Sequence, residues 1–92
     1  MVKPNQSADR LRELLAGNEL LVMPCCFDGL SAKMIARAGF PLTFMSGFAV
    51  SAARLGQPDT GLISYGEMVD QGRNICAAAD IPVIGDGDTG YG

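Results

Sequence analysis

The sequence predicts an α/β domain built around a parallel sheet. Apolar segments of strand length lie at about residues 20–27, 41–47 and 82–88. Their apolar residues do not alternate with polar ones. Segments with the spacing of amphipathic helices separate these strands. Strands that alternate with helices are typical of βαβ units, in which helices cover a parallel sheet or surround a closed barrel. The expected order is therefore a leading helix followed by βαβαβ.

The leading helix is expected at about residues 7–16. Ser7 has a side chain suited to an N-cap, Leu11, Leu14 and Leu15 share one face, and Gly17 is typical of a residue that ends a helix. The first strand is expected to follow directly, in the apolar run LLVMPCCF.

The helix after the first strand is expected to begin at Asp28, whose side chain can act as an N-cap. It should end near Gly39, and the second strand, PLTFMSG, follows. The apolar residues that recur at helical spacing are Leu30, Met34, Ile35 and Ala38.

The connection from Phe48 to Ile63 is long for a loop between a strand and a helix. Loops at the carboxyl ends of parallel strands often carry functional residues. After it, Ser64 and Glu67 form a capping box that predicts the start of a helix. The expected apolar face of that helix comprises Met68, Gly72, Ile75 and Ala79. Because the last strand has no helix after it and leaves an open sheet edge, we expect these residues to be part of a larger α/β domain.

Composition favours a folded protein and excludes several classes of partner. Hydrophobic residues make up 48% of the 92 residues, which is enough for a packed core. The net charge is −3 and no block of Lys or Arg occurs, so the basic surface of a nucleic-acid binder is absent from the sequence. The apolar runs are too short for a membrane span, and the charged N-terminal segment is unlike a signal peptide. The sequence therefore predicts a cytoplasmic protein that binds neither nucleic acid nor membrane.

The cysteines are not expected to take part in chemistry. Cys25, Cys26 and Cys76 form no C-x-x-C pair, and the chain has no histidine, so neither a disulfide framework nor a zinc site is expected. A thiol nucleophile also needs an activating base. We expect all three to pack as small apolar residues in a reducing compartment.

The segment GDGDTG, at residues 85–90, contains two candidate metal ligands, Asp86 and Asp88. At the end of an extended strand, residues i and i+2 face the same side, with Cα atoms about 6–7 Å apart. Two carboxylates this close favour a bound cation, and oxygen ligands without Cys or His favour Mg²⁺. The alternative is a solvated glycine turn with incidental acids.

The same segment also spells the dinucleotide-binding pattern G-x-G-x-x-G. That motif binds pyrophosphate at the first turn from strand to helix. Here it follows the third strand, and its acidic residues would repel a phosphate unless a metal intervened. An EF-hand is also disfavoured, because its loop needs further oxygen ligands and flanking helices.

Two other segments hold candidate binding residues. The Ser46 hydroxyl and the N–H groups of Gly47 and Phe48 follow the second strand and can converge on a small anion, although an ordinary Ser-Gly turn is the alternative. Asp59, in the long loop, either completes the outer shell of a metal or accepts a hydrogen bond within its own turn. Arg54 either neutralises an anionic substrate or is solvated.

Together these motifs resemble the N-terminal part of the isocitrate lyase/phosphoenolpyruvate mutase superfamily. The resemblance begins at about Leu20 and is carried, in order, by MPCCFDGLSAKMIARAGF, TFMSGFAVSAARLGQPD and ISYGEMVDQGRNICAAADIPVIGDGDTGYG. Members are (β/α)₈ TIM barrels of about 250 residues. The resemblance implies that residues 1–92 are a single partial domain, comprising the leading helix and the first three barrel strands.

The resemblance also implies roles for the candidate residues. Ser46, Gly47 and Phe48 match the family's Ser-Gly-x segment, which binds the carboxylate or phosphonate end of the substrate. The family lyases use a Cys in a Lys-Lys/Arg-Cys-Gly-His segment as acid or base, and this chain contains no such segment. A catalytic acid or base is therefore expected only beyond residue 92.

The metal site implied by the resemblance involves three acids. Asp86 matches the direct ligand of Mg²⁺, with Mn²⁺ as a possible substitute. Asp88 and Asp59 match acids that act through metal-bound water, Asp59 from a gating loop. The metal and the anion site would stabilise the negative charge of an enolate.

The implied activity is the Mg²⁺-dependent cleavage of a C–C bond in a small 2-hydroxy or 2-oxo di- or tricarboxylate. Phe44 stands where lyases of the family carry Tyr or Phe and phosphonate mutases carry Trp, which favours the branch that cleaves oxaloacetate or alkylmalates. One alternative is phosphonate chemistry, on phosphonopyruvate or carboxyphosphonoenolpyruvate. A non-enzymatic alternative is a small anion- or metal-binding module. For the full-length protein the resemblance implies a homotetramer.

Overall fold

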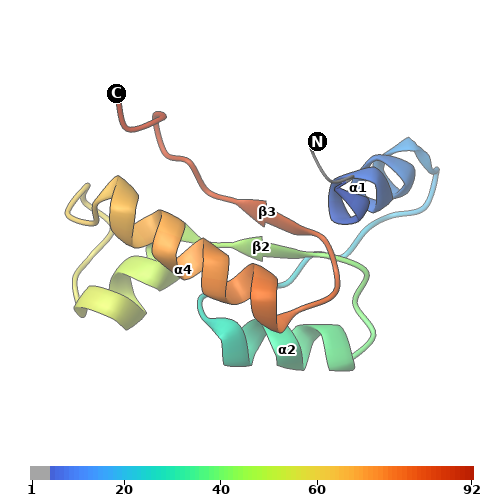
Figure 1. Cartoon of the computed structure of the whole chain (residues 1–92), viewed down its shortest axis with the longest axis horizontal. Coiled ribbons are helices and arrows are strands. Elements are labelled where there is room, and N and C mark those ends of the chain that lie inside the picture. The colour runs from blue at the N-terminus through green and yellow to red at the C-terminus, as the bar shows by residue number, and fades with distance from the viewer. Residues whose placement is uncertain (1–4) are drawn as a thin grey trace.

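The structure is a computed structural model that describes residues 5–92, so the first four residues of the predicted domain lie outside it. The elements are α1 (Gln6–Ala16), β1 (Cys25–Cys26), α2 (Gly29–Arg37), β2 (Thr43–Met45), α3 (Gly47–Val50), the π-helical segment η1 (Ser51–Leu55), α4 (Tyr65–Ala78) and β3 (Val83–Gly85) (Figure 1). The predicted order of a leading helix followed by βαβαβ is confirmed.

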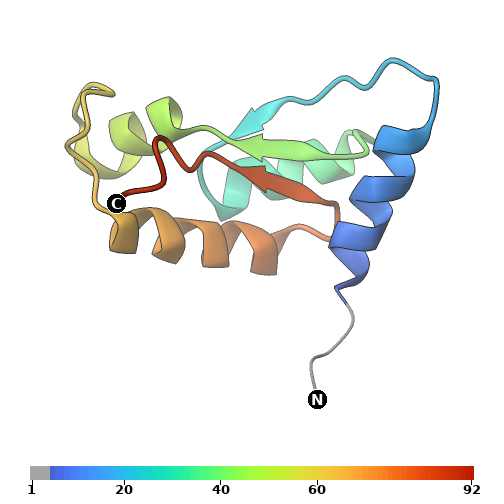
Figure 2. The same cartoon turned by 90° about the horizontal axis from the view of Figure 1, so that it is seen from above.

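The three strands form one parallel sheet in the order β1-β2-β3. Cys25 is level with Phe44, and Phe44 is level with Ile84, so the carboxyl ends of all three strands meet at one edge of the sheet. Figure 2 shows α3, η1 and the C-terminal residues at this edge, and α1 near the opposite end of the strands. The predicted parallel sheet is therefore confirmed, and the loops that can carry function lie together.

The strands are shorter than predicted from their apolar runs. β1, β2 and β3 occupy only residues 25–26, 43–45 and 83–85 of the segments predicted at 20–27, 41–47 and 82–88. Pro24 and Pro82 stand directly before β1 and β3, and proline has no N–H to contribute to a ladder. At the other end of β3, the Asp86 carboxylate accepts a hydrogen bond from Asp88 N–H at 2.9 Å, which turns the chain out of the extended conformation.

Helix α1 has a different cap from the one predicted. Asn5, rather than Ser7, is the N-cap, and its Oδ1 accepts a hydrogen bond from Ala8 N–H at 2.9 Å. The amide side chain stands at the position from which it reaches the third residue of the helix, whereas Ser7 already lies within the first turn. None of the residues of α1 is buried.

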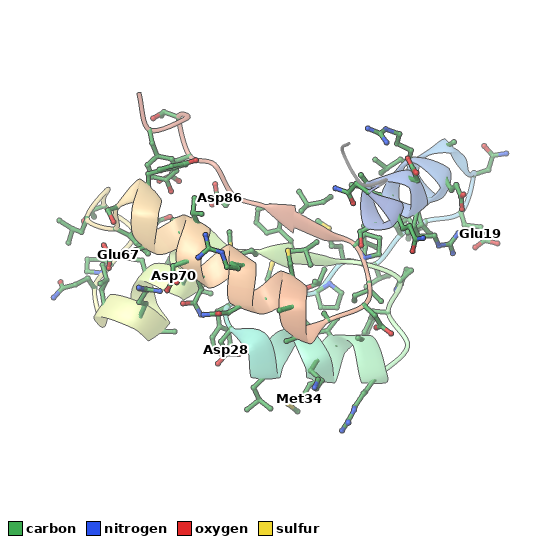
Figure 3. All side chains as sticks on the ribbon, in the orientation of Figure 1. Glu19, Asp28, Met34, Glu67, Asp70 and Asp86 are labelled. Atoms are coloured by element: carbon green, nitrogen blue, oxygen red, sulfur yellow. The ribbon has the colours of Figure 1, made fainter. Side chains whose placement is uncertain are left out.

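Helix α2 packs through its small residues and Ile35, and not through Leu30 and Met34, the other large residues of the predicted face. Leu30 and Met34 are 69% and 62% exposed, whereas Ala32 is fully buried. Figure 3 shows Met34 on the side of α2 that points away from the sheet. A Cβ at Gly29 would lie 3.2 Å from Ala78 Cβ, so the small side chains allow α2 to approach α4 closely. The predicted apolar face is therefore confirmed for Ile35, which packs against the core, and wrong for Leu30, Met34 and Ala38, which are exposed.

Helix α4 buries the predicted face against the sheet. Met68, Ile75 and Ala79 belong to the core, and a Cβ at Gly72 would lie 3.5 Å from the end of the Met45 side chain. The N-cap predicted at Asp28 for α2 and the capping box predicted at Ser64 and Glu67 for α4 are both formed, and Ser31 completes a capping box with Asp28. No helix within the described part of the chain has the length and apolar character needed to cross a membrane.

The cysteines differ in their surroundings. Cys26 is buried in the core, and this burial raises the pKa of its thiol, partly offset by a hydrogen bond with Thr43. Cys25 and Cys76 are exposed and free. The prediction that all three pack as apolar residues is therefore wrong for Cys25 and Cys76, because Cys25 alternates with the buried Cys26 along β1 and Cys76 is not one of the buried residues of α4.

Candidate metal and anion site

The sheet places Ser46 beside Asp86. Ser46 N–H donates to the carbonyl of Cys26 at 3.1 Å, and Asp86 N–H donates to the carbonyl of Met45 at 3.1 Å. The backbone ladder thus continues for one residue beyond the strands, and the two predicted sites meet at the carboxyl edge of the sheet. Figure 3 shows Asp86 at the end of β3.

The Asp86 carboxylate is held at both of its oxygens. Gly47 N–H donates to Oδ2 at 3.1 Å, and Asp88 N–H donates to Oδ1 at 2.9 Å. A Cβ at Gly47 would lie only 2.6 Å from Oδ2, so glycine is required to give the carboxylate this position. The side chain is half-buried. These contacts fix the orientation of Asp86 while leaving lone pairs on both oxygens for a further ligand.

Ser46 and Phe48 belong to the start of the short helix α3. Ser46 is its N-cap, and its Oγ accepts a hydrogen bond from Ala49 N–H at 3.2 Å. A hydroxyl that accepts one bond can still donate its own hydrogen to an anion. The Phe48 side chain is 65% exposed. The structure therefore brings Ser46, Gly47 and Phe48 to the edge where Asp86 lies, and their binding of an anion stays a prediction.

The long connection predicted as a loop is partly helical. Residues 47–55 form α3 and η1, and the chain leaves regular structure only at Gly56, which has φ 63°. The cap at Ser46 explains the helical start, because it supplies a partner to an N–H that has none within the helix. Asp59 lies in the remaining loop and is exposed.

Asp88 does not have the strand geometry from which its role was first argued. β3 ends at Gly85, and Asp88 has φ 45°, in the left-handed region, so the rule that residues i and i+2 face one side does not apply. The turn results from the bond between Asp86 Oδ1 and the Asp88 amide. Asp88 is exposed, and its role as a metal residue acting through water stays a prediction.

Negative charge gathers around Tyr91, beyond the end of β3. Burial, together with the charges of Asp88, Asp86 and Asp59, raises the pKa of Tyr91. The Tyr91 ring packs at a tilt on Tyr65, with centroids 5.7 Å apart.

The described residues fit part of a Mg²⁺ site. No group of three or more His, Cys, Asp or Glu side chains within residues 5–92 is arranged to hold a metal. Asp86 nevertheless offers a fixed, half-buried carboxylate in a negative field. Mg²⁺ is commonly held by one or two carboxylates together with waters, so this donor set fits the ion.

An apolar pocket adjoins this carboxylate. Its volume is about 320 Å³, and it lies between α4 and the turn after β3, with Met45, Met68, Tyr65 and Tyr91 among its lining residues. Asp86 is the one acid in this lining. The pocket is therefore suited to side-chain packing or to an apolar group rather than to an ion.

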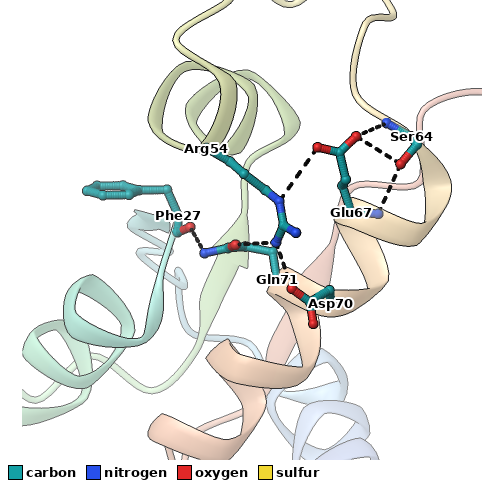
Figure 4. A network of polar contacts seen from close by, with 6 residues as sticks. All are labelled: Phe27, Arg54, Ser64, Glu67, Asp70 and Gln71. Carbon is teal, nitrogen blue, oxygen red and sulfur yellow. Dashed lines mark hydrogen bonds and ion pairs between the residues drawn. The ribbon is translucent and has the colours of Figure 1, made fainter.

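Arg54 is not available to neutralise a substrate in this structure. Its Nη1 donates to Asp70 Oδ2 at 2.8 Å and to Gln71 Oε1 at 3.1 Å, and its Nε lies 3.7 Å from Glu67 Oε2 (Figure 4). Sequence reasoning missed these contacts, because the partners lie on α4, in a different element. The capping box at Ser64 and Glu67 was the only signal of any of them.

The profile of the family described as "Phosphoenolpyruvate phosphomutase" matches residues 11–92. The chain belongs to this family. It is thereby a member of the isocitrate lyase/phosphoenolpyruvate mutase superfamily, as the resemblance implied. Its relatives are lyases and phosphomutases.

Three relatives of this chain illustrate the range of activities named within the family. The 2,3-dimethylmalate lyase of Eubacterium barkeri is 45% identical over 86 residues, which cover 94% of this chain and 30% of the lyase. The crystal structure of oxaloacetate acetylhydrolase aligns with a TM-score of 0.85 at 40% identity, over 94% of this chain and 31% of that one. A phosphonopyruvate hydrolase crystallised with oxalate and Mg²⁺ aligns with a TM-score of 0.87 at 32% identity, over 94% and 30%.

The chain thus spans about 30% of the length of the relatives it matches. Its structural neighbours are TIM barrels, and this family member corresponds to their N-terminal part. The predicted fold class is therefore confirmed.

Proposed function

We propose that the full-length protein is a Mg²⁺-dependent lyase that cleaves a C–C bond of a small 2-hydroxy or 2-oxo di- or tricarboxylate through an enolate. The contact that carries the proposal is the hydrogen bond between Gly47 N–H and the Asp86 carboxylate, because it joins the anion-binding segment to the metal ligand. The assignment of a C–C bond as the one cleaved is supported by relatives named for their action on 2,3-dimethylmalate and oxaloacetate.

Three acids are assigned to the metal ion. Asp86 would hold Mg²⁺ or Mn²⁺ directly, and Asp88 and Asp59 would act through water. A bound divalent ion supplies positive charge that stabilises an enolate oxygen.

The carboxylate end of the substrate is assigned to the segment after β2. The Ser46 hydroxyl and the N–H groups of Gly47 and Phe48 would donate to it, with the Gly47 N–H shared between the substrate and the Asp86 carboxylate. The catalytic acid or base is assigned to residues beyond 92. A homotetramer and a cytoplasmic location stay predictions.

Phosphonate chemistry is the second candidate. The structural similarity to a phosphonopyruvate hydrolase bound to oxalate and Mg²⁺ favours it, since the same donors can bind a phosphonate. Phe44 at the position two before Ser46 favours the lyase. The alternative of a simple binding module has no support among the relatives, which are enzymes.

The test is a parallel assay of the full-length protein on 2,3-dimethylmalate, oxaloacetate, 2-methylisocitrate and phosphonopyruvate, with Mg²⁺ and with a chelator. The proposal predicts that at least one of the first three substrates is cleaved and that the chelator abolishes cleavage. Turnover of phosphonopyruvate alone would establish the second candidate instead. Cleavage that persists in the chelator would overturn the role of the metal.

A further inference from the structure

One carboxylate joins the two ends of the loop that carries Asp59 (Figure 4). The loop covers residues 56–63, between η1 and α4. At its start, Arg54 Nε lies 3.7 Å from Glu67 Oε2. At its end, Ser64 donates to Glu67 Oε1 through both its N–H, at 3.1 Å, and its hydroxyl, at 2.9 Å. We call this arrangement of Arg54, Glu67 and Ser64 the loop neck.

The neck is anchored to the rest of the fold through Arg54. Its Nη1 donates to Asp70 Oδ2 at 2.8 Å and to Gln71 Oε1 at 3.1 Å. Gln71 Nε2 in turn donates to the carbonyl of Phe27 at 2.9 Å. Phe27 follows β1 at the carboxyl edge of the sheet. The neck is therefore tied to the same edge that presents Ser46 and Asp86.

The first residues of the loop are held by hydrogen bonds from the buried Ser51 side chain. Ser51 is 1% exposed, and its Oγ lies 3.2 Å from the carbonyl oxygens of both Gln57 and Pro58. Gly56 provides the left-handed turn between η1 and this segment. Asp59 comes directly after the held residues and is exposed. Beyond Asp59, Thr60 N–H donates to the carbonyl of Pro58 at 2.9 Å and Ile63 is only 5% exposed, so held residues lie on both sides of the acid.

We infer that Arg54 is a positioning residue that closes the loop neck and thereby sets the position of Asp59 relative to Asp86. The inference rests on the proposed function for the role of Asp59. A loop whose ends are joined has fewer conformations to lose when its acid moves to a metal, so the neck lowers the entropic penalty of closure. The Arg54 side chain is only 31% exposed, so water and salt screen its ion pairs less than those of a freely exposed side chain.

The first experiment measures amide hydrogen exchange in the full-length protein and does not depend on activity. Arg54→Ala opens the neck, and Glu67→Gln removes the charge pair while keeping a capping box, in which Gln also serves. Arg12→Ala is the control, because Arg12 forms an exposed pair with Asp9 on α1 at 3.0 Å. We expect exchange of residues 56–63 to rise about tenfold in the first two variants and to stay unchanged in the control. An unchanged loop in Arg54→Ala, or an equal rise throughout α4, would overturn the inference.

The second experiment is a double-mutant cycle on kcat/KM. We expect Arg54→Ala to lower kcat/KM about tenfold and to cause no further loss when added to Asp59→Ala, because both changes act through the same acid. Losses that multiply would overturn the inference. If the wild type cleaves none of the carboxylates, the proposed function fails, whereas the exchange experiment still decides whether Arg54 closes the neck.

Discussion

The amide of Gly47 donates a 3.1 Å hydrogen bond to the carboxylate of Asp86, across 39 residues of sequence. It joins the end of β2 to the end of β3 and determines where the candidate metal ligand points. Because a Cβ at Gly47 would meet the same oxygen at 2.6 Å, the position of Asp86 depends on the absence of a side chain at residue 47. The candidate metal ligand Asp86 therefore depends on the glycine at residue 47 for its position.

Gly47→Ala is expected to reduce the activity of the full-length protein about 100-fold. The added methyl group displaces the Asp86 carboxylate, and misplacements of about 1 Å near reacting groups have effects of this size. Steady-state kinetics measure the loss. Gly87→Ala is the matched control, because a Cβ there meets nothing within 4 Å, and it should remain near the wild-type rate. Equal activity in the two variants would show that the contact between Gly47 and Asp86 does not contribute to activity.

Asp88→Asn and Asp88→Gly separate charge from conformation at the turn. Asn and Gly both accept the left-handed conformation that Asp88 has at φ 45°. If Asp88 acts through metal-bound water, both variants raise the Mg²⁺ concentration for half-maximal activity about tenfold. The thermal midpoint should change little. A wild-type Mg²⁺ requirement in both variants would remove Asp88 from the metal site.

The start of α4 is expected to loosen in acid. Hydrogen bonds from the Ser64 amide and hydroxyl, and to a lesser extent the charge of Arg54, lower the pKa of Glu67. A group whose pKa is lowered on folding stabilises the fold above its unfolded pKa, and this contribution disappears as the pH falls through the folded value. NMR titration of the Glu67 carboxyl should show a midpoint below that of an ordinary glutamate, with the Ser64 amide shifting in parallel. A Ser64 amide that does not follow Glu67 would contradict the capping contact.

Ile75→Ala is expected to lower the free energy of unfolding by about 3 kcal/mol, because removal of a fully buried aliphatic side chain leaves a cavity. Denaturant unfolding of the full-length protein measures the change. Cys76→Ala alters the neighbouring, exposed residue of the same helix and should have little effect. Similar losses of unfolding free energy in both variants would contradict the burial of Ile75 in the core.

The parts of the fold that sequence predicted depend on local chemistry. The N-cap at Asp28 and the capping box at Ser64 involve residues within one turn of the chain, and the buried face of α4 follows from its own spacing. All three were found as predicted. The strand ends were not, because apolar composition does not show where Pro24 or the turn at Asp86 interrupts a ladder.

The features that the sequence did not predict are contacts between different helices and strands. Nothing in the spacing of α2 shows that it approaches α4 through Gly29, which leaves Met34 exposed. The contact of Gly47 with Asp86 and the contacts of Arg54 with α4 likewise exist only once the sheet has brought distant residues together. The candidate residues were thus identified from sequence, but the contacts that position them were not.

The central claim is that Asp86 holds a divalent ion that the reaction needs. The most direct measurement is Mn²⁺ binding, followed by electron paramagnetic resonance, in full-length wild-type protein and in Asp86→Asn, which keeps the size and most of the hydrogen-bonding capacity of the side chain. We predict that the wild type binds Mn²⁺ and cleaves its carboxylate substrate, and that Asp86→Asn loses at least about 100-fold in both Mn²⁺ affinity and kcat/KM, since outer-shell changes alone commonly lower either by 10–100-fold. Wild-type Mn²⁺ affinity in Asp86→Asn would contradict the account.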